Sequence, residues 1–307
     1  MATPLSAAKM LAALKAEGLT VHEHAGWKTH NRDGATGKAF GPVVGVLIHH
    51  TAGHGDKEVC FKGRSDLPGP LCHGWLGKTE GLWMIGSGRA NHAGLVDMDV
   101  LNALRDERSP LPRDDEANAD GNDVLYGLEI ENLGNSKDPY PDEQYRQAVL
   151  WAAAICRAHG WSEKSVAGHK ECQPGKIDPS FDMDDFRAAV KKQLAARPGS
   201  TATPAPSPST PKVDLSRLIA AAKTDPGARQ GHVTYMAGTN LTEAALVRLG
   251  YLGKTYAGDG SFGSTTVAAY AKWQRHLGYT GADANGIPGS KSLHYLGIKS
   301  GLFTVVA

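Results

Sequence analysis

The sequence lacks the features of a membrane protein or of a small protein stabilised by disulfide bonds. No apolar run approaches the ~18 residues of a membrane helix, and the opening MATPLSAAKMLAALKAEG has no basic start followed by an unbroken apolar core, so it is not a typical secretory signal. The four cysteines, Cys60, Cys72, Cys156 and Cys172, are scattered and form no CxxC pair. We therefore expect reduced thiols and a protein that is made and kept in a cytoplasm, without membrane insertion.

The chain also has little net charge, which gives no reason to expect a nucleic acid as its partner. Its formal net charge is +1, but this charge is unevenly distributed. Residues 1–196 contain 22 Lys and Arg against 27 Asp and Glu, whereas residues 213–307 contain 9 against 5. An acidic front part and a basic back part are compatible with a back part that binds an anionic surface.

A linker divides the chain. In residues 197–212, RPGSTATPAPSPSTPK, 11 of 16 residues are Pro, Ser or Thr and no apolar period is present. Such a composition favours an extended tether of up to ~50 Å. A length of 307 residues suits two domains. We expect a catalytic domain over 1–196, the linker over 197–212 and an accessory domain over 213–307.

Helical and strand patterns alternate before the linker. The nearly continuous apolar run VVGVLIHH at 43–50 predicts a strand buried on both faces. Asp142 can cap a helix that ends at Gly160, and Asp182 can cap another. Helices are expected over 6–17, 142–160 and 182–196, and strands over 43–50, 82–85 and 126–132. This order predicts an α/β fold with a mixed central β-sheet flanked by helices.

A weak repeat follows the linker. LGYLGKTYAGDGSFGSTT begins at Leu249 and LGYTGADANGIPGSKS begins at Leu277. The glycines can supply positive φ in turns, and the Ser or Thr after them can cap a helix such as 265–276, with Val267, Tyr270 and Trp273 facing inward. These patterns predict a small, mainly helical module.

The thirteen histidines are the first candidates for chemistry. His49 ends the buried strand, and His169 lies in a turn-rich loop with Lys176 and Asp178. Two imidazoles and a carboxylate are a ligand set that catalytic zinc uses, with its fourth position left for water. The spacing alone leaves open the alternative that these are ordinary hydrogen-bonded residues. Cys172, three residues after His169, is a rival zinc ligand.

Four motifs together resemble a known family. VLIHHTAG, NHAG, YGLEIEN and GHKECQPGKIDPS are similar to motifs of zinc-dependent N-acetylmuramoyl-L-alanine amidases, the type that shares its fold with peptidoglycan-recognition proteins and many phage endolysins. The resemblance implies that His49, His169 and Asp178 bind Zn²⁺, which favours Asp178 over the rival cysteine. It also implies that Glu129 transfers a proton from the attacking water to the leaving amine and that Lys176 stabilises the oxyanion. The bond cut would join N-acetylmuramic acid to L-alanine of the stem peptide.

Other residues receive weaker expectations. In the family, histidines at the positions of His73 and His92 line the substrate groove, although a groove wall without a chemical role remains an alternative. His50 is expected to point away from the metal. The acidic segment 114–123 fails the calcium-loop pattern and is expected to be a solvated insertion.

The back module resembles peptidoglycan-binding domains of the three-helix kind. The implied function is that of a monomeric phage endolysin, with bacterial peptidoglycan as its partner, which acts on the cell wall after release from the host cytoplasm. One alternative is a non-catalytic recognition protein on the same fold, which would be expected to lack a zinc ligand. Another is a recycling amidase for soluble fragments, which would need no wall-binding module.

Overall fold

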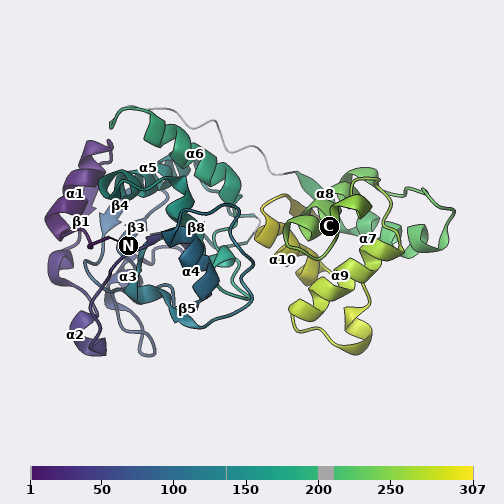
Figure 1. The fold of residues 1–307 in the computed structure, drawn as a ribbon, viewed down its shortest axis with the longest axis horizontal. Coiled ribbons are helices and arrows are strands. Elements are labelled where there is room, and N and C mark those ends of the chain that lie inside the picture. Colours follow the sequence, from purple (N-terminus) through teal and green to yellow (C-terminus); the bar gives the residue numbers. More distant parts are fainter. Residues whose placement is uncertain (1, 136, 200–210, 307) are drawn as a thin grey trace. The chain divides into compact units, whose positions relative to one another are not determined.

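The computed structural model describes residues 2–135, 137–199 and 211–306, and most of the expected linker lies outside these ranges. The chain forms two compact units (Figure 1). One is built from residues before the linker and the other from residues after it, except that residues 180–182 group with the second unit.

The first unit contains a six-stranded mixed sheet with the order β1-β4-β3-β7-β2-β8. The only antiparallel pair in this sheet is β3 with β4. The strands are β1 (Val21–Glu23), β2 (Gly45–His50), β3 (Gly74–Leu76), β4 (Leu82–Met84), β7 (Leu125–Ile130) and β8 (Val166–Gly168). The mixed sheet flanked by helices that the sequence predicts is thus confirmed.

Strand β2 lies between two parallel partners, β7 and β8, and every one of its residues is buried. This burial explains why its sequence is apolar until the two histidines. Because side chains alternate along a strand, Leu47 and His49 share one face, while Ile48 and His50 share the other. The strand therefore delivers one histidine to each side of the sheet.

Helices cover both faces of the sheet. Helix α5 (Asp142–His159) packs against β2, β3 and β7 and is flanked by α1 (Ala7–Ala16) and α6 (Met183–Ala195) (Figure 1). On the other face, α4 (Met98–Arg105) contributes Leu101 and Leu104 to a buried cluster with Leu47 of β2. The shorter elements of this unit are α2 (Asp33–Thr36), α3 (Lys57–Lys62), β5 (Leu95–Val96) and β6 (Ala119–Asp120).

The helix ends agree with the expected capping residues in part. Gly160 ends α5 with φ 71°, as predicted. Asp142, however, is the first residue of α5 rather than its cap, because Pro141 occupies the cap position without a side-chain hydrogen bond. An acidic side chain in the first turn still interacts favourably with the helix dipole.

The acidic segment 114–123 is not simply a solvated insertion. Its last part forms β6, which pairs with β5. The carboxylates of Asp120 and Asp123 accept hydrogen bonds from the guanidinium of Arg89, which is only 5% exposed. A buried guanidinium requires such partners. The sequence alone did not reveal the pairing of Arg89 with these two carboxylates.

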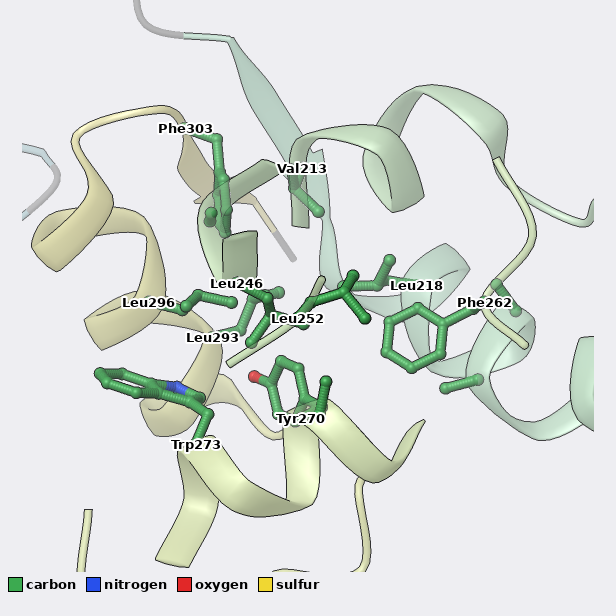
Figure 2. Close-up of a cluster of buried hydrophobic side chains, with 14 of the residues drawn as sticks. Val213, Leu218, Leu246, Leu252, Phe262, Tyr270, Trp273, Leu293, Leu296 and Phe303 are labelled. Atoms are coloured by element: carbon green, nitrogen blue, oxygen red, sulfur yellow. The ribbon is translucent and has the colours of Figure 1, made fainter. Parts of the chain in front are cut away.

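The second unit is helical around its own core. It contains α7 (Leu215–Thr224), α8 (Met236–Arg248), α9 (Ser264–His276) and α10 (Ser290–Ser300), and β9 (Lys212–Asp214) pairs in parallel with β10 (Thr304–Val306). Figure 2 shows Tyr270 and Trp273 of α9 facing Leu293 and Leu296 of α10. Both aromatic side chains face inward, as the sequence predicts.

Helix α9 differs from the prediction at its start. Gly263 is its cap, with extended backbone and no side-chain hydrogen bond, so the expectation of a Ser or Thr cap is wrong. Among the described residues, no helix combines the length and the apolar character needed to cross a bilayer.

Candidate metal centre

Two adjacent strand ends and one loop bring the three predicted metal ligands together. His49 is near the end of β2, and His169 directly follows β8, the parallel neighbour of β2. Because carboxyl ends of adjacent parallel strands meet at the same edge, the two imidazoles lie side by side. Asp178 approaches from the following loop, where the backbone N–H of Lys170 donates to its carbonyl oxygen.

The three donor atoms form a nearly equilateral triangle. Nδ1 of His49 lies 3.0 Å from Nδ1 of His169, and each nitrogen lies 3.1 Å from Oδ2 of Asp178. A tetrahedral zinc with bonds of ~2.0–2.1 Å requires donor atoms about 3.3 Å apart, which is close to this spacing. Among the described residues, this is the one group of three His, Cys, Asp or Glu side chains that could hold a metal ion. The residues present therefore fit a divalent metal.

The second ring nitrogens of both histidines have hydrogen-bond partners. Nε2 of His49 lies 3.0 Å from Nδ1 of His92. Nε2 of His169 lies 3.1 Å from the carbonyl oxygen of Ala93 and 3.0 Å from Oε1 of Gln173. Partners of this kind hold Nε2 as the protonated nitrogen and leave Nδ1 unprotonated for a metal.

Electrostatics also favour ligands in their metal-binding forms. Burial, together with the nearby His169, lowers the pKa of His49 to about 4, so this imidazole is neutral at pH 7. Burial opposes ionisation of Asp178, but the adjacent His169 and His49 rings hold its pKa well below the usual value. Neutral imidazole and ionised carboxylate are the forms that coordinate metals.

His92 lies between the imidazole of His49 and the backbone carbonyl group of Leu125. Its Nδ1 can accept the proton of His49, and its Nε2 donates to the carbonyl oxygen of Leu125, at 3.0 Å. Burial lowers its pKa well below the usual value. Gly127 allows this arrangement, because a Cβ there would lie 2.5 Å from Nδ1 of His92.

His73 is engaged entirely by the backbone. Its Nδ1 accepts from the N–H of Gly127, at 2.9 Å, and its Nε2 donates to the carbonyl oxygen of Gly88, at 2.8 Å. The side chain is 2% exposed. Its position fits a packing role, and it has no ring nitrogen left for a substrate.

Glu129 lies beside the candidate metal ligands. It pairs with His49 in the register of β7 with β2, and the two side chains share one face. Its Oε2 is buried and has no hydrogen-bond partner in the part of the chain that the structure describes. Burial raises the pKa of Glu129 well above its usual value, with a further rise from Cys60 and Asp178 and an opposing effect from Lys176. A poorly solvated carboxyl group of this kind is suited to proton transfer.

The remaining candidate residues differ in their position relative to the three candidate ligands. Lys176 is partly exposed and close enough to influence the pKa of both His49 and Glu129. Cys172 belongs to the same buried apolar cluster as Leu47 and is not a member of the candidate metal group. His50 points to the opposite face, where its Nδ1 lies 3.0 Å from the hydroxyl of Tyr140.

The sequence did not identify two residues that support the site. Gln173 holds His169, and its position four residues after that histidine in the same loop was an available signal. Asn122 accepts three backbone N–H groups from the segment that carries His92. No local pattern reveals this second role, because the two segments meet only in the folded chain.

The buried histidines predict a loss of stability in mild acid. Burial lowers the pKa of His73 to about 4, against 6.5 for an unperturbed histidine. The unfolded chain therefore binds a proton between these pH values that the folded chain resists, so stability decreases as the pH falls. From pH 7 to pH 5 we expect this residue to contribute a loss of about 2 kcal/mol.

Urea unfolding of metal-free protein at the two pH values would measure this loss. The variant His73→Gln should show a smaller decrease than the wild type, while His22→Gln, at an exposed position, should show the same decrease as the wild type. An equal decrease in the wild type and His73→Gln would contradict the assignment.

Comparisons with known proteins address the family. Residues 39–181 match the sequence model of the family described as N-acetylmuramoyl-L-alanine amidase. The search of curated proteins found no similar sequence. The matched range contains all three ligands of the triangle.

Several solved structures are similar to this one at low identity. The amidase AmiD from E. coli is 18% identical, with a TM-score of 0.37, 86% of this chain covered and 92% of AmiD covered. A selenomethionine derivative of AmpD is 18% identical, with a TM-score of 0.38, and the match covers 55% of this chain and 94% of AmpD. A mutant endolysin from Bacillus subtilis is 15% identical, with a TM-score of 0.35 and coverages of 56% and 99%.

The family match confirms the resemblance inferred from the four sequence motifs. It covers five of the six strands of the sheet, all but β1, together with the strand ends and the loop that carry the candidate metal centre. Residues 39–181 therefore form a type 2 N-acetylmuramoyl-L-alanine amidase domain.

Proposed function

We propose that this protein is a zinc-dependent endolysin that hydrolyses the amide between the lactyl group of N-acetylmuramic acid and L-alanine of the stem peptide. The observation that carries the proposal is the convergence of two imidazole nitrogens and one carboxylate oxygen within 3.1 Å of one another. His49, His169 and Asp178 would hold the zinc ion.

A bound zinc ion would lower the pKa of a coordinated water toward ~7 and polarise the scissile carbonyl group. Glu129 accepts the proton of the attacking water. It then donates this proton to the departing amine, so that the carboxylate is regenerated. Its burial supports this role, because a raised pKa brings the carboxyl group nearer to the pH at which it must accept and return a proton.

Lys176 stabilises the oxygen of the scissile carbonyl as negative charge develops on it. The effect of its charge on the pKa values of His49 and Glu129 supports this role. For His92 we propose orientation of His49 rather than binding of the glycan or the peptide, because its two ring nitrogens already have partners.

The decisive experiment is a digestion of purified bacterial cell wall with zinc-loaded and chelated protein. The proposal requires new free amino groups of L-alanine, no new reducing sugar ends, and loss of both turnover and bound metal after chelation. Reducing ends without amino groups would indicate a glycosidase. Undiminished release of amino groups by metal-free protein would remove zinc from the mechanism.

Glu129→Gln separates proton transfer from metal binding. Gln has nearly the same shape but cannot accept the proton, so we expect hydrolysis to fall by about 10²–10⁴-fold while zinc affinity changes little. Zinc affinity by chelator competition and turnover on cell wall would test this. Glu143→Gln, on the exposed surface of α5, is the control. Wild-type turnover of Glu129→Gln would exclude Glu129 from the mechanism.

We further propose that residues 213–307 bind the cell wall and that residues 197–212 tether them to the amidase domain. The proposal is supported by the resemblance of the LGY repeats to peptidoglycan-binding domains and by the excess of 9 basic over 5 acidic residues in this part. A bound anchor raises the effective concentration of the catalytic domain at an insoluble substrate. We place the protein in the host bacterial cytoplasm before lysis and on the wall afterwards, as a monomer.

Deletion of residues 197–307 tests the anchor. The remaining 1–196 should adsorb more weakly to cell walls in a sedimentation assay but should hydrolyse soluble muropeptides at the rate of the full chain. Unchanged adsorption would show that the second unit is not the anchor. A parallel loss on soluble fragments would indicate instead that it supports the amidase domain.

A further inference from the structure

One short segment, residues 92–94, contacts both imidazole ligands of the candidate metal centre. Nδ1 of His92 lies 3.0 Å from Nε2 of His49, and the carbonyl oxygen of Ala93 lies 3.1 Å from Nε2 of His169. The orientation of both rings therefore depends on where this segment lies.

A single side-chain oxygen holds the segment. Oδ1 of Asn122 accepts hydrogen bonds from the backbone N–H groups of His92, Ala93 and Gly94, at 2.8, 2.8 and 3.2 Å. The φ of Gly94 is +61°, which belongs to the left-handed region. Successive N–H groups that converge in this way form a concave site for an oxygen atom, and the amide of Asn122 fills it.

Asn122 is itself fixed in place. Its side chain is buried, at 8% exposure, and its backbone N–H donates to Oδ1 of Asp120, at 3.1 Å. Asp120 and Asp123, on either side of it, both bind the buried guanidinium of Arg89. The N–H of Gly121 also donates to the carbonyl oxygen of Gly94, at 2.9 Å. These contacts fix the position of Oδ1 of Asn122.

We propose that Asn122 is a positioning residue for the metal centre, acting on both histidine ligands through residues 92–94. This inference rests on the proposed function, because it assigns a role toward the metal that His49 and His169 would hold. Asn122 touches neither the metal ligands nor the reacting atoms. It determines where the two hydrogen-bond acceptors behind the imidazoles lie.

Removal of the amide oxygen leaves three N–H groups without their acceptor, and the N–H of Ala93 among them is buried. The segment must then move or admit water, because unsatisfied buried donors are costly. Both imidazoles lose the acceptors that orient Nδ1 toward the metal. Loss of such supporting hydrogen bonds typically weakens metal binding 10–100-fold, and since Asn122 acts one residue further away, we expect about tenfold.

The test compares three variants of the full-length protein. Asn122→Ala removes the acceptor, whereas Asn122→Asp keeps an oxygen in the same place. Asn118→Ala is the matched control. Asn118 lies in the same acidic segment, 114–123, as Asn122, but its Oδ1 accepts a hydrogen bond from the N–H of Met98, at 2.9 Å. Zn²⁺ affinity is measured by chelator competition, and the geometry of the centre by the visible absorption spectrum of bound Co²⁺.

We expect Asn122→Ala to bind Zn²⁺ about tenfold more weakly and to show an altered Co²⁺ spectrum. Asn122→Asp should restore affinity and spectrum toward those of the wild type, and Asn118→Ala should match the wild type. A folded Asn122→Ala protein with wild-type affinity and spectrum would overturn the positioning role.

Two further results distinguish a failure of the positioning role from misfolding of the variant and from a failure of the proposed function. If Asn122→Ala does not fold, Gly94→Ala strains the same turn from its exposed side, and wild-type affinity and spectrum in that variant would overturn the role equally. If the wild-type protein itself neither binds Zn²⁺ nor releases amino groups from cell wall, the proposed function fails, whatever the variants show.

Discussion

The site depends on three electron-rich atoms held against one another. Two imidazole nitrogens and a carboxylate oxygen at 3.0–3.1 Å repel unless a proton or a cation lies between them. The fold enforces this approach, because His49 and His169 end adjacent parallel strands and Asp178 is joined to the same loop. The packing of the sheet holds the three atoms together against this repulsion, and a divalent ion bound between them would relieve it.

The part of this arrangement that follows from local pattern was predictable. The apolar run of β2 predicts a buried strand, and the alternation of side chains then places His49 and His50 on opposite faces. For Asp178, by contrast, the residue types only suggest a ligand set and the choice rests on the resemblance, since its distance from His49 along the chain carries no geometric information. The amidase family itself was predicted correctly from the four motifs.

What the sequence could not show depends on contacts between distant segments. Asn122 lies in an acidic stretch that has the composition of a solvated loop, but Arg89 pairs with Asp120 and Asp123 on either side of it, and its Oδ1 accepts hydrogen bonds from the backbone of residues 92–94. The same limitation applies to His73, because the two backbone groups that engage its ring come from separate parts of the fold. The composition of the surrounding sequence therefore does not predict which groups these side chains contact.

The second unit shows a similar effect of burial on charge. Glu243 is fully buried, where its carboxylate accepts from the N–H of Gly258 and from the hydroxyl of Thr266, and Asp225 accepts from the N–H of Phe262. These carboxylates hold the glycine-rich turn of the repeat from the inside. Of the 5 acidic and 9 basic residues in 213–307, two acidic residues and one basic residue, Lys299, are therefore buried, which leaves 3 acidic against 8 basic residues outside the interior.

The raised pKa of Glu129 links the two halves of the proposed mechanism. Burial and the nearby Asp178 favour the protonated form of Glu129, which cannot accept a proton, whereas Lys176 favours the carboxylate. A divalent ion held by Asp178 would reverse the effect of that residue and add to the effect of Lys176. Metal binding and ionisation of Glu129 would then be thermodynamically coupled. Glu129 would become a base when the metal is bound, which is also when a water could be activated. In the proposed mechanism this coupling would account for a carboxyl group beside the ligand triangle whose Oε2 has no hydrogen-bond partner among the described residues, because a bound ion would balance its charge.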